Sequence, residues 1–304
     1  MHSRTHPKCV GLAFCLISLL LWAAPLQAAR DTVKLSYVKW SSEIASTNVV
    51  KAVLQEKMGY DCEIEAMNAE EMWRSVAEGE VDAMVGAWLP ETHEHFMQEF
   101  EDQVVDLGPN LEGARIGLAV PDVTLGRQTA GTGLRNEPYI KAESIANLNK
   151  YADKFNHLII GIDPEAGIMK KTKEAIEAYD LQNFELTTGN ERSMTRDLGR
   201  AITAHGWIVV TAWVPHWKFA RWDLKFLEDP KNVFGGEEHI NTIVRKDLAE
   251  DMPEVAEFLD NFSWKPEDMG QLMIWIHEDD GQYPYEKALR YIRTHPEQVE
   301  SWLP

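Results

Sequence analysis

The chain has 304 residues, of which 44% are hydrophobic, and it carries a formal net charge of -19 at pH 7. This apolar content is sufficient to bury the core of one large domain or of two smaller ones. The strong acidity argues against nucleic acid and anionic membrane surfaces as partners, because both would repel the protein. It favours a highly soluble protein and does not by itself identify a ligand.

The first residues of the chain predict export. A basic start is followed by the apolar run "VGLAFCLISLLLWAAP" and the small residues of "LQAAR", an order typical of a secretory signal peptide, which we assign to residues 1–29. No other window approaches the roughly 18 to 20 continuous apolar residues that a membrane helix needs. Cys9 and Cys15 lie in the signal without a lipobox-like context, so Cys62 alone remains in the mature chain and no intramolecular disulfide is expected.

Apolar runs and helix-capping residues then alternate along the chain. The expected order is strand 32–38, helix 46–59, strand 62–67, helix 68–79 and strand 81–88. Asn68 and Glu71 have the spacing of a capping box, which supports the second of these helices. A β-α-β-α-β order predicts a parallel sheet with crossover helices.

The same order of elements returns in the second half of the chain. The expected elements there are strand 157–162, helix 164–179, strand 184–188, helix 191–205 and strand 207–213. Four helical segments close the chain and are expected to pack back on the first unit, at 253–262, 266–278, 285–295 and 296–303. We therefore predict an α/β fold of two lobes with a parallel-type sheet in each. Lobe 1 comprises residues 30–121 and 237–304, and lobe 2 comprises residues 122–236.

Tryptophans stand at the ends of the predicted strands. Trp40 follows the first strand, while Trp88 in "GAWLPETH" and Trp213 in "TAWVPHW" end two others and are each followed by a proline. Ligands of open parallel sheets bind beyond the carboxyl ends of the strands, so three indoles from two facing lobes would form a box between them. The ligand that favours such a box is a quaternary ammonium, which the negative ring faces attract.

The box cannot be the whole site. At about 0.5 to 2 kcal/mol per ring it supplies roughly 2 to 6 kcal/mol, whereas micromolar affinity needs about 8 kcal/mol. The helix start in "GIDPEAGIM" offers unpaired backbone N–H groups, and the amides of Gly167 and Ile168 are candidate donors to a carboxylate. His93 can add a third hydrogen bond from the other lobe. The ligand implied is a zwitterion with a quaternary nitrogen at one end and a carboxylate at the other.

Two other readings of these residues are weaker. His93 and His95 with Glu91 suggest a metal site, but the two imidazoles point to opposite faces of an extended chain and sit about 200° apart on a helix. For catalysis the chain offers no GxSxG, HExxH or phosphate-binding loop, so we expect neither an enzyme nor a cofactor. His216 is interpreted as a local structural residue, and Asp163 as part of an ordinary helix entry.

With these residues in place, the sequence resembles the glycine betaine/proline betaine substrate-binding proteins of ABC transporters, the OpuAC-like family. The matching stretches, which are spread over most of the mature chain, are "WSSEIAST", "AWLPETH", "GIDPEAGIM", "TAWVPHW" and "LEDPKNVFG…EEHINTIVRK". The resemblance implies a type II periplasmic-binding fold with two crossings and the ligand in the cleft between the lobes. It implies ligand contacts from Trp40, Trp88, Trp213, His93, Gly167 and Ile168.

The resemblance also implies partners and a location. We expect a monomeric periplasmic receptor that delivers glycine betaine or a near relative to an ABC permease driven by a separate ATPase, for osmoprotection. Choline or carnitine specificity is the alternative, and a metal-binding receptor is a more distant one. The missing lipobox implies a free periplasmic protein, whereas many relatives are lipid-anchored. The loop 124–143 looks longer than the family pattern and stays unassigned.

Overall fold

The computed structural model describes residues 32–123 and 138–304. The predicted signal peptide and most of the loop 124–143 lie outside the described residues. Within the described ranges, none of the helices is long and apolar enough to cross a membrane.

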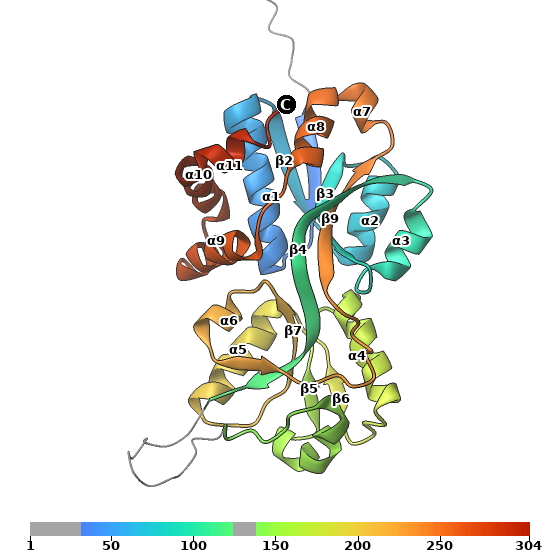
Figure 1. The fold of residues 1–304 in the computed structure, drawn as a ribbon, viewed down its shortest axis with the longest axis vertical. Helices are drawn as coiled ribbons and strands as arrows, with labels where there is room; N and C mark the ends of the chain where they lie inside the picture. The colour runs from blue at the N-terminus through green and yellow to red at the C-terminus, as the bar shows by residue number, and fades with distance from the viewer. Residues whose placement is uncertain (1–31, 124–137) are drawn as a thin grey trace, which may run out of the picture. The chain divides into compact units, whose positions relative to one another are not determined.

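The described strands form one sheet in the order β2-β1-β3-β9-β4-β7-β5-β6, with β8 paired to β4 (Figure 1). Their bounds are β1 Thr32–Tyr37, β2 Asp61–Ala66, β3 Ala83–Leu89, β4 Val104–Pro121, β5 Leu158–Ile160, β6 Glu185–Thr187, β7 Val210–Val214, β8 Leu224–Phe226 and β9 Glu238–Arg245. β1 is parallel to β2 and β3, and β5 is parallel to β6 and β7, as the β-α-β order predicts. β4 and β9 are antiparallel to their neighbours.

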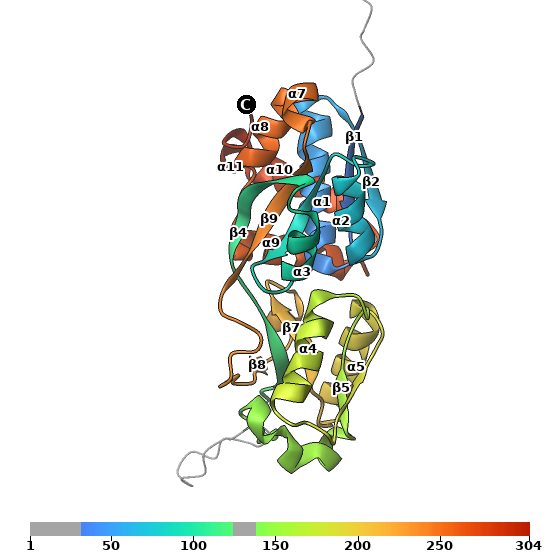
Figure 2. The same ribbon diagram turned by 90° about the vertical axis from the view of Figure 1, so that its right-hand side faces the viewer.

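Helices flank both groups of parallel strands (Figures 1 and 2). Their bounds are α1 Ser41–Val53, α2 Ala69–Ala77, α3 Glu94–Phe100, α4 Gly167–Ala178, α5 Glu191–Thr203, α6 Lys218–Arg221, α7 Leu248–Asp251, α8 Pro253–Asn261, α9 Pro266–Glu278, α10 Pro284–Thr294 and α11 Pro296–Glu300. A π-helical segment, η1 Leu54–Met58, extends α1, and a 3-10 segment, η2 Ile145–Phe155, precedes β5. The capping box of Asn68 and Glu71 is confirmed at the start of α2.

α1 begins at Ser41, earlier than the predicted start near residue 46. The reason lies far away in sequence, because the carboxylate of Glu191 accepts the backbone N–H of Ser41 over 2.8 Å and so satisfies a donor of the first turn. The end is as predicted: Gly59 adopts a φ of 73° after η1, in the left-handed region that favours glycine. Toward the end of the chain, α9 and α10 pack on α1.

β4 connects the two halves of the molecule. From Val104 to Ala114 it pairs with β9, and from Arg115 to Pro121 it pairs with β7 and β8. The chain therefore passes from one half of the molecule to the other within β4. Residues 115–121, which are predicted to belong to lobe 1, pair with strands of the second half. We call the half built on β1, β2, β3 and β9 lobe 1, and the half built on β5, β6, β7 and β8 lobe 2.

Candidate ligand-binding site

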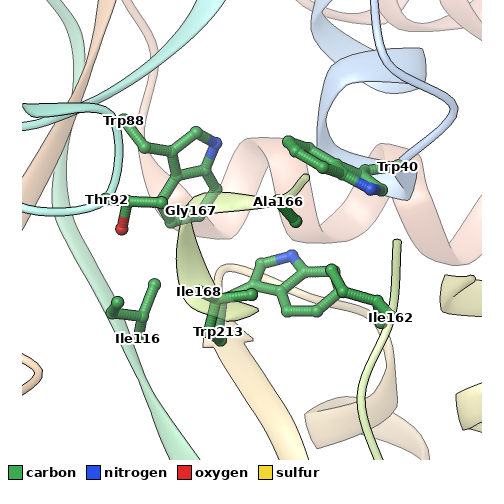
Figure 3. Close-up of a pocket in the computed structure, with 9 residues that line it drawn as sticks. All are labelled: Trp40, Trp88, Thr92, Ile116, Ile162, Ala166, Gly167, Ile168 and Trp213. Carbon is green, nitrogen blue, oxygen red and sulfur yellow. The ribbon is translucent and has the colours of Figure 1, made fainter. Parts of the chain in front are cut away.

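A small cavity lies between lobe 1 and lobe 2 (Figure 3). About 310 Å³ of space free of protein atoms lies within it, part of which is open to solvent. The residues that line it are Trp40, Trp88, Thr92, Ile116, Ile162, Ala166, Gly167, Ile168 and Trp213. The structure thus brings five of the six predicted site residues to one cavity, and His93 does not line it.

Trp40 is fixed by hydrogen bonds from both lobes. Its backbone N–H donates to the carbonyl of Val38 over 2.7 Å, and the Val38 N–H donates to Oε2 of Glu43 over 2.7 Å. Glu43 is almost fully buried, and this burial raises its pKa to about 8. From lobe 2, Asp163 accepts a hydrogen bond from the indole Nε1 of Trp40 over 3.0 Å. Asp163 is therefore more than the ordinary helix entry that we expected.

The other two indoles are carried by buried strands. Trp88 lies near the end of β3 and Trp213 near the end of β7, and both side chains are buried. Each is followed by an aliphatic residue and a proline, and the Leu89–Pro90 and Val214–Pro215 peptide bonds are both cis. Because the two strands belong to different lobes, the two rings approach the cavity from opposite sides.

His93 lies behind the cavity wall and is fully buried. Its Nδ1 accepts hydrogen bonds from the backbone N–H of Trp88 over 3.1 Å and from Nε1 of Trp73 over 3.4 Å. Nδ1 is thus an acceptor, so the proton of the neutral ring sits on Nε2, which has no partner among the described residues. Burial, followed by the nearby His95, lowers the pKa of His93 to about 3. The imidazole is therefore neutral at pH 7, and its Nε2–H is a donor without an acceptor in the described chain. The ring centroids of His93 and Trp40 are 6.3 Å apart.

The first turn of α4 supplies two further free donors. Gly167 opens this helix after Ala166, which provides no side-chain cap. In the described part of the chain, the N–H groups of Gly167 and Ile168 donate to no other residue, whereas the next amide, that of Met169, donates to Ala166. Both residues line the cavity (Figure 3). A helix N-terminus of this kind favours an anion.

Gly167 also allows the lobes to come close together. A methyl group in place of its hydrogen would lie 1.9 Å from the carbonyl oxygen of Thr92 in lobe 1. Thr92 is itself held by the buried carboxyl group of Glu238, which accepts its N–H and its hydroxyl over 2.7 Å each. A glycine is therefore required at this position by the approach of a backbone from the other lobe.

Glu191 at the start of α5 makes a third contact between the lobes. Its carboxylate accepts the N–H and the hydroxyl of Ser41, and Nε2 of His216 lies 3.0 Å from its Oε1. Trp217 donates from its indole to the same Ser41 hydroxyl over 3.0 Å. Burial would raise the pKa of Glu191, but His216 and the hydrogen bonds of Ser41 outweigh it and lower that pKa. An ionised, buried carboxylate thus ties α5 to the start of α1.

Four lining residues were missed from the sequence. Thr92 and Ala166 directly precede predicted site residues, so proximity in sequence is a signal that could have found them. Ile116 in β4 and Ile162 shortly after β5 are ordinary apolar residues that carry no such signal. His95 lies against Phe96, with 3.9 Å between the ring centroids. Across residues 32–123 and 138–304, no group of three or more His, Cys, Asp or Glu side chains is placed to hold a metal ion.

Known proteins are similar to this chain in sequence and in fold. Over 152 residues, which are 49% of this chain and 50% of the relative, the chain is 46% identical to the glycine betaine/carnitine transport binding protein GbuC of Listeria monocytogenes. The match therefore spans half the length of this curated relative.

Two solved structures match almost the whole chain. The lactococcal OpuAC in its closed conformation with glycine betaine is 38% identical and superposes with a TM-score of 0.80, covering 90% of this chain and 100% of that one. The glycine betaine, L-proline-binding protein ProX of Borrelia burgdorferi is 33% identical, with a TM-score of 0.80 and coverage of 90% and 97%. The predicted α/β fold of two-lobed binding proteins is confirmed by these matches.

The family profile described as the substrate binding domain of ABC-type glycine betaine transport systems, OpuAC, matches residues 31–294. Since this range covers most of the sequence, the chain belongs to the OpuAC family of substrate-binding domains.

Proposed function

We propose that the protein binds glycine betaine, or a near relative, between its lobes and delivers it to the permease of an ABC importer. The observation that carries this proposal is the cavity wall of three indoles, two from lobe 1 and one from lobe 2. A quaternary ammonium donates no hydrogen bond and is attracted by the faces of aromatic rings, so it suits this wall better than a primary amine does. Membership of the family and the glycine betaine complex of the lactococcal protein support the same class of ligand.

The other end of the ligand is inferred from donors without partners. Gly167 and Ile168 line the cavity, and in the described chain their backbone N–H groups have no acceptor. Nε2 of His93 is buried and also has no acceptor there. Leaving buried donors unpaired costs about 1 to 3 kcal/mol each. A carboxylate satisfies such donors, so a ligand with a carboxylate is favoured over choline, which has none.

The last part of the proposal concerns where the protein acts and how the ligand is imported. The signal peptide predicted for residues 1–29 supports a periplasmic location for the receptor, and the energy for import would come from a separate ATPase subunit. Accumulation of a compatible solute serves osmoprotection. These statements rest on the family and on the predicted signal.

Calorimetric titration of the purified protein with four compounds tests the proposal. Glycine betaine is expected to bind most tightly, and carnitine, which is longer, more weakly in so small a cavity. Choline tests the carboxylate end, and we expect its affinity to be lower by about a hundredfold because the donors stay unpaired. 3,3-Dimethylbutyrate has the shape of glycine betaine without the positive charge, and we expect a loss of at least about tenfold. If none of the four binds, the proposed function is wrong.

Asp163 offers a smaller test of the same site. Replacing Asp163 by alanine removes the acceptor of the Trp40 indole, a hydrogen bond between the lobes that forms only when they are closed. We expect the affinity for glycine betaine to fall by about three- to tenfold, the usual effect of one such bond. Asp163→Asn keeps an oxygen acceptor and is expected to restore most of the affinity. Equal losses in both variants would show that the charge, and not the hydrogen bond, matters.

A further inference from the structure

Lys218 places an amino group against one of the cage tryptophans. Its side chain is fully buried at the start of α6, and its Nζ lies 3.9 Å from the centroid of the Trp213 ring. In the described part of the chain no acceptor lies within hydrogen-bonding distance of this nitrogen. An ammonium group in this position has lost its water and makes a cation–π contact with the indole.

The amino group of Lys218 stands over a ring face of Trp213. A nitrogen this close to the ring centroid has to stand over one of the two ring faces, since in the ring plane it would collide with the ring atoms. Lys218 does not line the cavity, which uses Trp213 as a wall. The ring of Trp213 therefore borders both the cavity and the buried amino group of Lys218. Trp213 and Lys218 both belong to lobe 2, so this arrangement does not depend on closure.

The surroundings leave the charge on Lys218 poorly stabilised. Burial lowers the pKa of Lys218 to about 7, and Glu191 on α5 opposes this shift. His216, in the turn before α6, accepts the backbone N–H of Lys218 at its Nδ1 over 3.0 Å, and burial lowers the pKa of His216 to about 4, so its ring is neutral. Glu191 in turn interacts electrostatically with the buried Glu43 of α1 and with His277 of α9.

We propose that Lys218 sets the affinity of the cage through Trp213, because its charged and neutral forms leave this indole with different attraction for a quaternary ammonium in the cavity. The inference rests on the proposed function in that it takes the ligand to be such a cation. Lys218 is thus a positioning residue that acts through Trp213 and does not touch the ligand.

The sign follows from repulsion between two cations. The ammonium and the ligand nitrogen would stand roughly 8 Å apart beside the same ring, since cations sit within about 6 Å of a ring centroid. At the effective dielectric constant of a protein, this repulsion alone corresponds to about ten- to thirtyfold in affinity, and the ligand carboxylate, which lies farther from Lys218, offsets part of it. The ligand therefore binds the form with neutral Lys218 more tightly and lowers the pKa of Lys218 further. Affinity is highest above the pKa of the free protein and falls as the pH drops through it, and binding releases protons.

Calorimetry between about pH 6 and about pH 8.5 tests this inference. For the wild type we expect glycine betaine to bind about three- to tenfold more tightly at the upper pH, with proton release detected by repeating the titration in buffers of different ionisation enthalpy. Lys218→Met has a similar length and no charge. It should bind at the lower pH as tightly as the wild type does at the upper pH, with no proton release. Lys218→Met with the wild-type pH profile, or with equally weakened binding at every pH, overturns the proposal.

Two further measurements separate this inference from other causes. Glu43→Gln removes a buried carboxyl group whose pKa is raised to about 8, so it tests whether Glu43 causes the pH dependence instead. Whatever its absolute affinity, this variant should keep the midpoint of the wild-type pH profile. NMR of lysine ε-carbons in the ligand-free protein should show one lysine that titrates near neutral pH and that is missing in Lys218→Met. This resonance does not require a ligand, so it tests the ionisation of Lys218 even if glycine betaine fails to bind. Its absence from the wild type also overturns the proposal.

Discussion

Trp88→Ala is expected to weaken the binding of glycine betaine by about thirty- to a hundredfold while the ligand-free protein stays folded. Trp88 lines the cavity from β3 and is 3% exposed. Its removal takes away one aromatic face, worth about 0.5 to 2 kcal/mol for a cation, and part of the apolar contact with the methyl groups. The sum is about 2 to 3 kcal/mol of binding free energy. Calorimetry gives the affinity, and thermal unfolding without ligand reports on folding.

Two variants sharpen this prediction. Trp88→Phe keeps a smaller ring and is expected to bind with an affinity between those of the wild type and Trp88→Ala. Trp275→Ala is the matched control: this half-buried indole on α9 lies under Arg290, with 4.0 Å to its centroid, and does not line the cavity. It should bind glycine betaine as the wild type does. Wild-type affinity in Trp88→Ala would show that the indoles do not hold the ligand.

Local sequence signals account for the elements and for most of the cavity wall. Ligands of parallel sheets bind beyond the carboxyl ends of the strands, and Trp40, Trp88 and Trp213, at or near such ends in the two lobes, line one cavity. The capping box of α2 and the glycine that ends η1 are equally local, and both are confirmed. Short elements without such patterns, for example α3 and β8, were missed.

Contacts between the lobes could not be predicted from the sequence. The start of α1 at Ser41 depends on Glu191, which is 150 residues away in the chain. Asp163 beside a proline has the appearance of any helix entry, and only the closed lobes bring it to Trp40. Lys218 in "HWKFAR" is indistinguishable in sequence from a solvated lysine, because its burial is decided by how α6 folds over Trp213.

These contacts explain how closure and binding are coupled. Asp163 with Trp40, Glu191 with Ser41, and Gly167 against Thr92 each join the lobes beside the cavity. None of them can form while the lobes are apart, so each adds to the stability of the closed form alone. A ligand that bridges the indoles of both lobes favours the same form. Changes at these contacts should therefore alter affinity and leave the stability of the separated lobes nearly unchanged.

Gly167→Ala is the strongest test of this coupling. The added methyl group would lie 1.9 Å from the carbonyl oxygen of Thr92, a backbone atom that cannot rotate away. Overpacking of this kind costs about 1 to 3 kcal/mol, which corresponds to a loss of affinity of about five- to a hundredfold. The melting temperature without ligand should stay near that of the wild type, because the clash exists only between closed lobes. Glycine betaine should then raise the melting temperature much less than it does in the wild type.

Gly270→Ala on α9 is the matched control for this substitution. A methyl group at Gly270 would meet no atom within 4 Å, so the variant should keep wild-type affinity and gain about 0.5 to 1 kcal/mol of stability from its better helix propensity. The effect of the contact with Thr92 on affinity can also be separated from the effect of the Gly167 amide. Alanine keeps the N–H, so a loss of affinity in Gly167→Ala must come from the obstructed approach of the lobes. If Gly167→Ala instead binds normally, the lobes of the liganded protein do not close as far as this contact requires.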